Sequence, residues 1–141
     1  MSEIKAPPIA TVMLVDDEEV DQMLYRRIVE RSAHAETLIS FVDAGKALQY
    51  LIERREPRPD LILLDINMPV MDGFGFLDLA AKELGRDQTP VIFMLTTSFD
   101  PQDRARAEAN DLVQGYVEKP LTEQKLEDFR LILADLAPGV A

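Results

Sequence analysis

The feature that most constrains this fold is a short apolar run that ends in an aspartate. Residues Leu61–Leu64 are all aliphatic, Pro59-Asp60 precedes them, and Asp65 follows them directly. A continuous apolar run of this length, with no alternation of polar residues, is typical of a strand buried on both faces of a parallel sheet. The pattern therefore predicts a parallel sheet with Asp65 at the carboxyl end of a central strand.

Further strand-like runs alternate with helical patterns along the chain. We expect these strands at Ile9–Val15, Thr37–Val42, Val91–Leu95 and Gly115–Glu118, the last of them less apolar and therefore at an edge of the sheet. Because right-handed crossovers place the connecting helices on both faces of a parallel sheet, the alternation predicts a doubly wound α/β fold. The expected architecture is a five-stranded parallel sheet in three α/β/α layers, with a flavodoxin-like (βα)5 order.

Helix ends and helix faces are also predicted from the sequence. Asp43 and Thr122 are residue types that cap helix N-termini, and each precedes a run with apolar residues at helical spacing. In the first helix, Val20, Leu24 and Ile28 recur every four residues, so we expect them to form its buried stripe. Such a stripe would turn the charged residues of this helix toward solvent.

Length and composition favour one domain with a protein or a metal as its partner. The 141 residues are 47% hydrophobic, which is enough for one core, and the formal net charge is -11. A nucleic-acid backbone or an anionic membrane would repel such a chain, so neither is expected as a partner. The sequence lacks cysteine, a signal-peptide core and a membrane-spanning apolar run, which predicts a cytoplasmic protein. We expect the domain to span residues 9–137, between short tails at 1–8 and 138–141.

Charged and polar side chains stand at the carboxyl ends of the predicted strands. Asp16 and Asp17 follow the first strand, Asp65 the third, Thr96 the fourth and Lys119 the fifth. In open α/β sheets these strand ends share one rim, where ligands bind, so the five side chains should converge. Carboxylates brought together repel each other unless a cation joins them, and Mg²⁺ suits oxygen ligands of this kind.

The converging groups suit the transfer of a phosphoryl group to Asp65. A carboxylate can attack phosphorus and form an acyl phosphate if positive charge offsets the repulsion between the two anions. Mg²⁺ held by Asp16, Asp17 and Asp65 would supply that charge, and Lys119 would add a second cation. A threonine hydroxyl at the end of the fourth strand could donate to a phosphoryl oxygen.

In this order the motifs resemble the receiver domain of bacterial two-component response regulators, over nearly the whole chain. Val15-Asp16-Asp17-Glu18 is similar to the family's acidic pair, Asp65-Ile66-Asn67-Met68-Pro69 with Asp72-Gly73 to its phosphoacceptor and following loop, and Lys119-Pro120 to its lysine and proline. The resemblance implies a single-domain signalling protein rather than an enzyme. It also implies that Asp65 accepts a phosphoryl group from a sensor histidine kinase or a histidine phosphotransfer protein.

The resemblance implies further roles for individual residues. Mg²⁺ would lie on Asp17, Asp65 and the backbone carbonyl of Asn67, with Asp16 acting largely through water. Tyr116 matches the family's switch aromatic. We expect a downstream protein to read the phosphorylated state on the face formed by the fourth helix, the fifth strand and the last helix.

Two threonines compete for the phosphate-sensing position. Thr96 is followed by a small residue, as in the family, whereas counting back from Lys119 fits Thr97 about as well. We prefer Thr96, because Thr97 is then the small residue that follows it, and we expect Asp100-Pro101 to absorb the difference of one residue in the loop.

Two other functions fit parts of this pattern less well. A phosphatase with an Asp nucleophile resembles an Asp-x-Asp pattern whose second Asp is the general acid, but here that position is Asn67. A degenerate receiver would bind partners without being phosphorylated, and it is disfavoured because the required side chains are all present.

Overall fold

The computed structural model describes residues 6–97 and 100–136, and it contains the predicted parallel sheet. The strands are β1 (Ile9–Val15), β2 (Ala35–Phe41), β3 (Leu61–Leu64), β4 (Val91–Thr96) and β5 (Val113–Glu118). The helices are α1 (Glu19–Ser32), α2 (Ala44–Ile52), α3 (Gly73–Glu83), α4 (Pro101–Glu108) and α5 (Glu123–Leu136), with a 3-10 turn at Arg86–Gln88. The strand order is β2-β1-β3-β4-β5 and every neighbouring pair is parallel, which confirms the predicted fold class and the edge position of β5.

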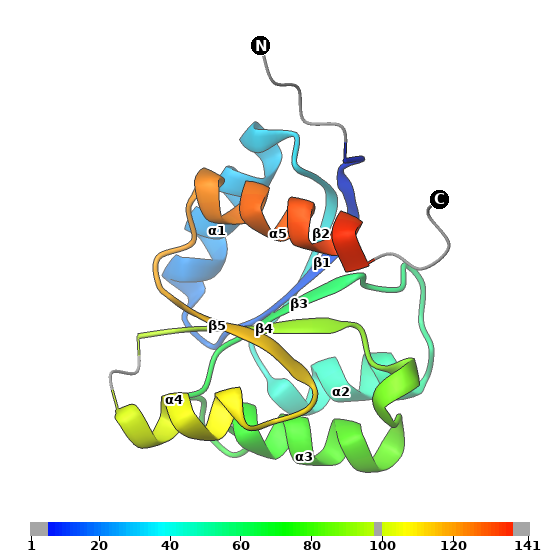
Figure 1. Ribbon diagram of the computed structural model, residues 1–141, viewed down its shortest axis with the longest axis vertical. Helices are drawn as coiled ribbons and strands as arrows, with labels where there is room; N and C mark the ends of the chain where they lie inside the picture. Colours follow the sequence, from blue (N-terminus) through cyan, green and yellow to red (C-terminus); the bar gives the residue numbers. More distant parts are fainter. Residues whose placement is uncertain (1–5, 98–99, 137–141) are drawn as a thin grey trace.

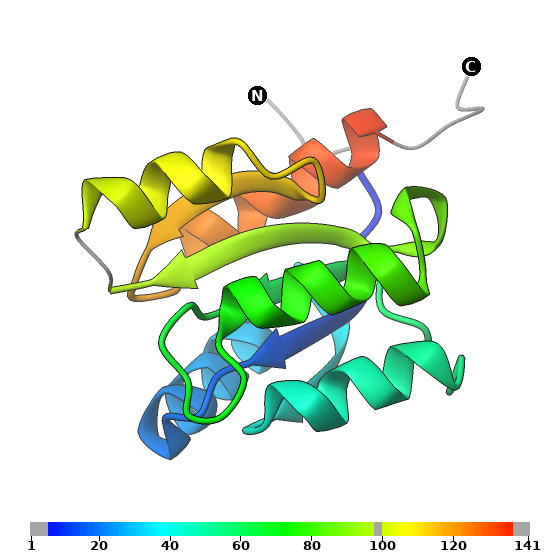
Figure 2. The ribbon, with the colours of Figure 1, turned by 90° about the horizontal axis from the view of Figure 1, so that it is seen from below.

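Alternate residues of the central strands face opposite layers of helices. In β3, Ile62 and Leu64 pack in a core with α2, α3 and α4, whereas Leu61 and Leu63 pack in a second core with α1 and α5. Figure 1 shows the two helical layers on either side of the sheet, and Figure 2 shows α2, α3 and α4 side by side over one face. Each of these four β3 residues is at most 1% exposed, and this burial on both faces is the reason the strand is apolar throughout.

Helix α1 packs on a different face from the one predicted. Val20 and Leu24 are 63% and 49% exposed, and Ile28 is only partly buried. Tyr25 and Val29 face the sheet instead. The prediction of a buried stripe at Val20, Leu24 and Ile28 was therefore wrong for its first two members.

A hydrogen-bonded side chain explains the rotation of α1. The Gln22 amide nitrogen donates to the backbone carbonyls of Asp16 and Phe41, at 2.8 and 3.0 Å, so it joins the helix to the ends of β1 and β2. With Gln22 on the inner face, Asp21 also points toward the carboxyl rim of the sheet, where its carboxylate reaches Lys119.

The predicted helix caps are present. The Asp43 carboxylate accepts from the Lys46 backbone N–H at 3.1 Å, and the Thr122 hydroxyl accepts from the Lys125 backbone N–H at the same distance. These bonds satisfy backbone donors that the first turn of a helix leaves without a partner.

The predicted tail at 138–141 lies outside the described residues, as do residues 1–5 of the predicted N-terminal tail. Within the described ranges, none of the helices combines the length and the apolar character that a membrane span requires.

Candidate functional site

Three carboxylates meet at the carboxyl rim of the sheet. Asp16 and Asp17 follow β1 and Asp65 follows β3, and each offers an oxygen that lies within 4.8 Å of the other two. The strand ladders hold this arrangement, because the Asp65 backbone N–H donates to the Val15 carbonyl and that of Asp16 to the Phe41 carbonyl, both at 3.0 Å. Asp16 and Asp65 are buried, and Asp17 is half-buried.

The two buried carboxylates are oriented by backbone N–H groups. Asp16 Oδ1 accepts from the Glu18 N–H at 2.9 Å, and Asp65 Oδ1 accepts from the Ile66 N–H at 2.8 Å. The Oδ2 atom of each carboxylate therefore faces the interior of the site. Carboxylate oxygens grouped in this way suit a hard divalent cation such as Mg²⁺.

Lys119 lies among these carboxylates. Its Nζ atom is 2.7 Å from Asp16 Oδ2, 3.0 Å from Asp65 Oδ2 and 2.8 Å from Asp21 Oδ2, and only 6% of its side chain is exposed. Burial by itself lowers the pKa of the Lys119 ammonium, but the bonds to the three carboxylates outweigh burial and raise the pKa above its usual range. Lys119 is therefore a permanent internal cation at neutral pH.

For Asp16, unlike Lys119, burial outweighs the other influences on the pKa. It raises the pKa of the Asp16 carboxyl to about 6, although the Lys119 ammonium and the Glu18 N–H both favour the charged form. Asp16 Oδ2 forms an ion pair with Lys119, but within the described part of the chain it receives no well-aligned hydrogen bond. A metal that used this oxygen would therefore have to share it with the Lys119 ammonium.

The remaining predicted site residues lie around this cluster. The Lys119 backbone N–H donates to the Thr96 carbonyl at 3.0 Å, so β4 and β5 end side by side at the rim. Thr96 is fully buried, whereas Thr97 is exposed. Tyr116 is half-buried on β5, with the Arg104 guanidinium 5.6 Å from its ring centroid. The Lys119-Pro120 peptide bond is cis.

The loop after Asp65 is closed by a glycine that no other residue could replace without movement. The Gly73 N–H donates to the Ile66 carbonyl at 2.9 Å, and a Cβ atom on Gly73 would lie 2.5 Å from the Asp65 carbonyl oxygen. In the same loop Asn67 and Val70 are exposed, and Val70 has a φ of 67°, an unfavourable backbone angle for a β-branched residue. Because Gly73 has no side chain, α3 can begin in close contact with the Asp65 backbone.

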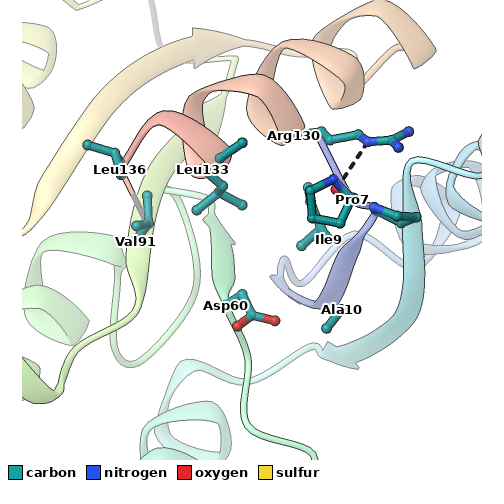
Figure 3. A pocket seen from close by; sticks show the side chains of 10 residues that line it. Pro7, Ile9, Ala10, Asp60, Val91, Arg130, Leu133 and Leu136 are labelled. Carbon is teal, nitrogen blue, oxygen red and sulfur yellow. Dashed lines mark hydrogen bonds between the residues drawn. The ribbon is translucent and has the colours of Figure 1, made fainter. Parts of the chain in front are cut away.

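A separate cavity of about 430 Å³ lies near the start of β1, away from the acidic rim. Figure 3 shows it between the starts of β1 and β4 and the last turns of α5, with Arg130 donating to the Pro7 carbonyl on one side. Its lining is mainly apolar, and none of the predicted site residues contributes to it. We therefore assign the chemistry to the rim.

Comparison with known proteins agrees with the geometry of the rim. Residues 12–129 match the family described as the response regulator receiver domain. The chain belongs to this family. The resemblance seen in the sequence is thereby confirmed, and the receiver domain places the chain in two-component signalling.

Individual relatives show how widely this receiver domain is distributed. Response regulator Rcp1 of Synechocystis is 34% identical over 107 residues, which are 73% of this chain and 71% of Rcp1. The sensor histidine kinase AruS of Pseudomonas aeruginosa is 31% identical over 140 residues, which are 95% of this chain but 13% of the kinase. A crystal structure of a two-component response regulator from Cytophaga hutchinsonii is similar with a TM-score of 0.82 and 30% identity, covering 91% of this chain and 98% of that one.

Sequence reasoning missed Asp21 and Gln22 as parts of the site. Both belong to the face of α1 that was assigned to solvent, and the error in the helix phase concealed them. The only sequence signal was the spacing of Asp21 and Tyr25, which places them one turn apart on the same face.

Proposed function

We propose that this receiver domain accepts a phosphoryl group on Asp65 from a sensor histidine kinase or a histidine phosphotransfer protein. The observation that carries the proposal is the position of the Asp65 carboxylate. It lies within 4.8 Å of the Asp16 and Asp17 carboxylates, and its Oδ2 atom is 3.0 Å from the Lys119 ammonium. A phosphoryl group on Asp65 would therefore lie between an internal cation and a donor set for Mg²⁺.

We propose that four groups hold Mg²⁺, namely the carboxylates of Asp16, Asp17 and Asp65 and the backbone carbonyl of Asn67. The grouping of these three carboxylates, each with an oxygen within 4.8 Å of the other two, supports this assignment. When bound, the ion supplies positive charge between the anionic nucleophile and the phosphoryl oxygens.

In the proposed reaction an oxygen of the Asp65 carboxylate attacks phosphorus. An O–P bond to Asp65 forms as the P–N bond to the donor histidine breaks, and the departing imidazole keeps the electron pair of that bond. Lys119 pairs with a phosphoryl oxygen, and a threonine hydroxyl donates to another. We prefer Thr96 to Thr97 for this hydroxyl, because a small residue follows Thr96, as in the family.

The Asp17→Ala variant tests the proposed metal ligands. Wild-type protein should melt at a higher temperature as Mg²⁺ is added, because an ion that binds only the folded state stabilises it by mass action. In Asp17→Ala this rise should disappear, together with phosphorylation by acetyl phosphate. Thermal melts and intact-mass spectra measure the two effects, and a variant that retains both would show that the ligands are wrongly assigned.

Proton competition at Asp16 should make the affinity for Mg²⁺ depend on pH. Because burial raises the pKa of Asp16 to about 6, this carboxyl is protonated in the metal-free protein below that pH. Ligand carboxylates must be deprotonated, so the affinity should fall by up to about tenfold per pH unit below pH 6 and level off above pH 7. Mg²⁺ titrations by calorimetry at constant ionic strength measure this dependence. An affinity unchanged from pH 7 to pH 5 would contradict the role of Asp16.

The raised pKa of Asp16 also determines how the stability of the metal-free protein changes with pH. The folded state binds the Asp16 proton more tightly than the unfolded state, whose carboxyl has a pKa of 3.8. The contribution of Asp16 to the free energy of unfolding is therefore fully present below pH 3.8 and is lost as the pH rises through about 6.

We further propose that phosphorylation is read on the face formed by α4, β5 and α5. Tyr116 is half-buried on β5 beneath Arg104, so its ring can move between a more exposed and a more buried position. Beryllofluoride, a phosphoryl mimic, should slow amide exchange in the segment between Thr96 and Thr122. Changes confined to α1 and α2 would exclude this output face.

The cytoplasmic location of the protein, which we expect from the sequence, stays a prediction.

A further inference from the structure

Asp21 occupies a place that the proposed phosphoryl chemistry does not yet explain. Its carboxylate lies 2.8 Å from Lys119 Nζ, and its side chain is 27% exposed, compared with 1% for Asp16. Of the three carboxylates that contact Lys119 within the described residues, Asp16 and Asp65 also belong to the grouped metal donors, and Asp21 does not. Asp21 therefore contacts the internal cation without being a candidate metal ligand.

Lys119 and a bound metal would compete for the same oxygens. On both Asp16 and Asp65, Oδ1 is held by a backbone N–H and Oδ2 contacts the Lys119 ammonium. A second cation that used these Oδ2 atoms would therefore share them with the ammonium or displace it. Two like charges at such a short separation repel each other strongly unless another anion offsets the repulsion.

We infer that Asp21 is a positioning residue that retains the Lys119 ammonium when Mg²⁺ and the phosphoryl group engage Asp16 and Asp65. This inference rests on the proposed function. Asp21 keeps the lysine close enough to pair with the phosphoryl group, while the Oδ2 atoms of Asp16 and Asp65 become available to the metal.

The surroundings of Asp21 suit this role. Its neighbour Gln22 joins α1 to the ends of β1 and β2, so the start of the helix cannot drift away from the rim. The backbone of Lys119 is tied to Thr96, which limits movement at the base of the lysine. Both members of the Asp21–Lys119 pair therefore come from anchored backbone.

A double-mutant cycle on Mg²⁺ affinity tests the inference. The dissociation constant for Mg²⁺ would be measured by calorimetry for the wild type, Asp21→Asn, Lys119→Met and the double variant. Asp21→Asn should weaken binding about tenfold when Lys119 is present and by less than about twofold when it is absent. Glu19→Gln, which removes an exposed charge from the same helix turn, is the matched control and should change affinity by less than about twofold.

The other possible results of the double-mutant cycle would overturn the inference. An equal loss of affinity in both lysine backgrounds would mean that Asp21 acts by general charge, and no loss in either would mean that it has no role; both overturn the inference and leave the proposed function intact. If Lys119→Met does not fold, Asp21→Glu replaces it, and this variant should recover most of the affinity that Asp21→Asn loses. Equal affinities for Asp21→Glu and Asp21→Asn would overturn the inference. Failure of the wild type to bind Mg²⁺ would overturn the inference and the proposed function together.

Discussion

The Asp65→Asn variant should fold and take up no phosphoryl group. Asn has nearly the same shape as Asp, and its amide oxygen can still accept the Ile66 N–H that holds Asp65 Oδ1. It lacks the carboxylate that attacks phosphorus, so the nucleophile is lost while the site remains assembled. Phosphorylation by acetyl phosphate and Mg²⁺, followed by intact mass, should show complete loss, and circular dichroism should show an unchanged fold.

Asp60→Asn is the matched control for this variant. Asp60 lies just before β3, at the opposite end of the same strand, where its carboxylate accepts from the Thr11 N–H at 3.0 Å. This variant should be phosphorylated like the wild type. Labelling of Asp65→Asn, or loss of labelling in Asp60→Asn, would place the phosphoacceptor elsewhere.

Lys119→Met should produce the largest loss of stability among single changes at the rim. Methionine fills similar space but leaves the carboxylates of Asp16, Asp21 and Asp65 without the cation that they share. Removing one partner from a buried ion pair costs about 3 kcal/mol or more in the free energy of unfolding, because the remaining charge is uncompensated. Added Mg²⁺ should restore much of this loss by supplying a replacement cation.

Urea unfolding with and without Mg²⁺ measures this effect. Lys82→Met is the control, since Lys82 is exposed on α3, and it should change the free energy of unfolding by less than about 0.5 kcal/mol. Equal stabilities of Lys119→Met and Lys82→Met, or a loss that Mg²⁺ does not reduce, would contradict the view that Lys119 neutralises the cluster.

Most of the sheet could be predicted from the sequence because burial on both faces makes a strand apolar at every position. The strand Ile9–Val15 was predicted with both ends correct, and β3 is as apolar as expected. The bounds of the two edge strands were predicted less precisely. β2 begins at Ala35 and β5 at Val113, each two residues before the predicted start, because their half-buried residues give a weaker signal.

The face of α1 could not be predicted from apolar spacing alone. Val20 and Leu24 satisfy the helical period but are exposed, whereas the polar Gln22 is turned inward by bonds to two strand ends. Such bonds join residues that are distant in sequence, so a local sequence pattern cannot predict them. The same rotation brings Asp21 to Lys119, a contact between residues 98 positions apart.

The convergence of Asp16, Asp17, Asp65 and Lys119 was predictable for a topological reason. All strands of a parallel sheet end at one rim, so residues that follow different strands meet there whatever the details of the loops. The sequence does not specify which oxygen each backbone N–H holds, or that Asp16 and Asp65 present Oδ2 to the same lysine. Those features depend on loop geometry, including the close approach of Gly73 to the Asp65 carbonyl.

One measurement tests most directly whether Asp65 carries the phosphoryl group. The wild-type chain would be incubated with acetyl phosphate, with and without Mg²⁺, and its intact mass determined. Reduction of the product with borohydride would then convert the labile acyl phosphate to a stable alcohol whose position peptide fragmentation identifies. We predict one phosphoryl group per chain, formed only with Mg²⁺ and located at Asp65. No added mass, or a phosphoryl group located at another residue, would contradict the account.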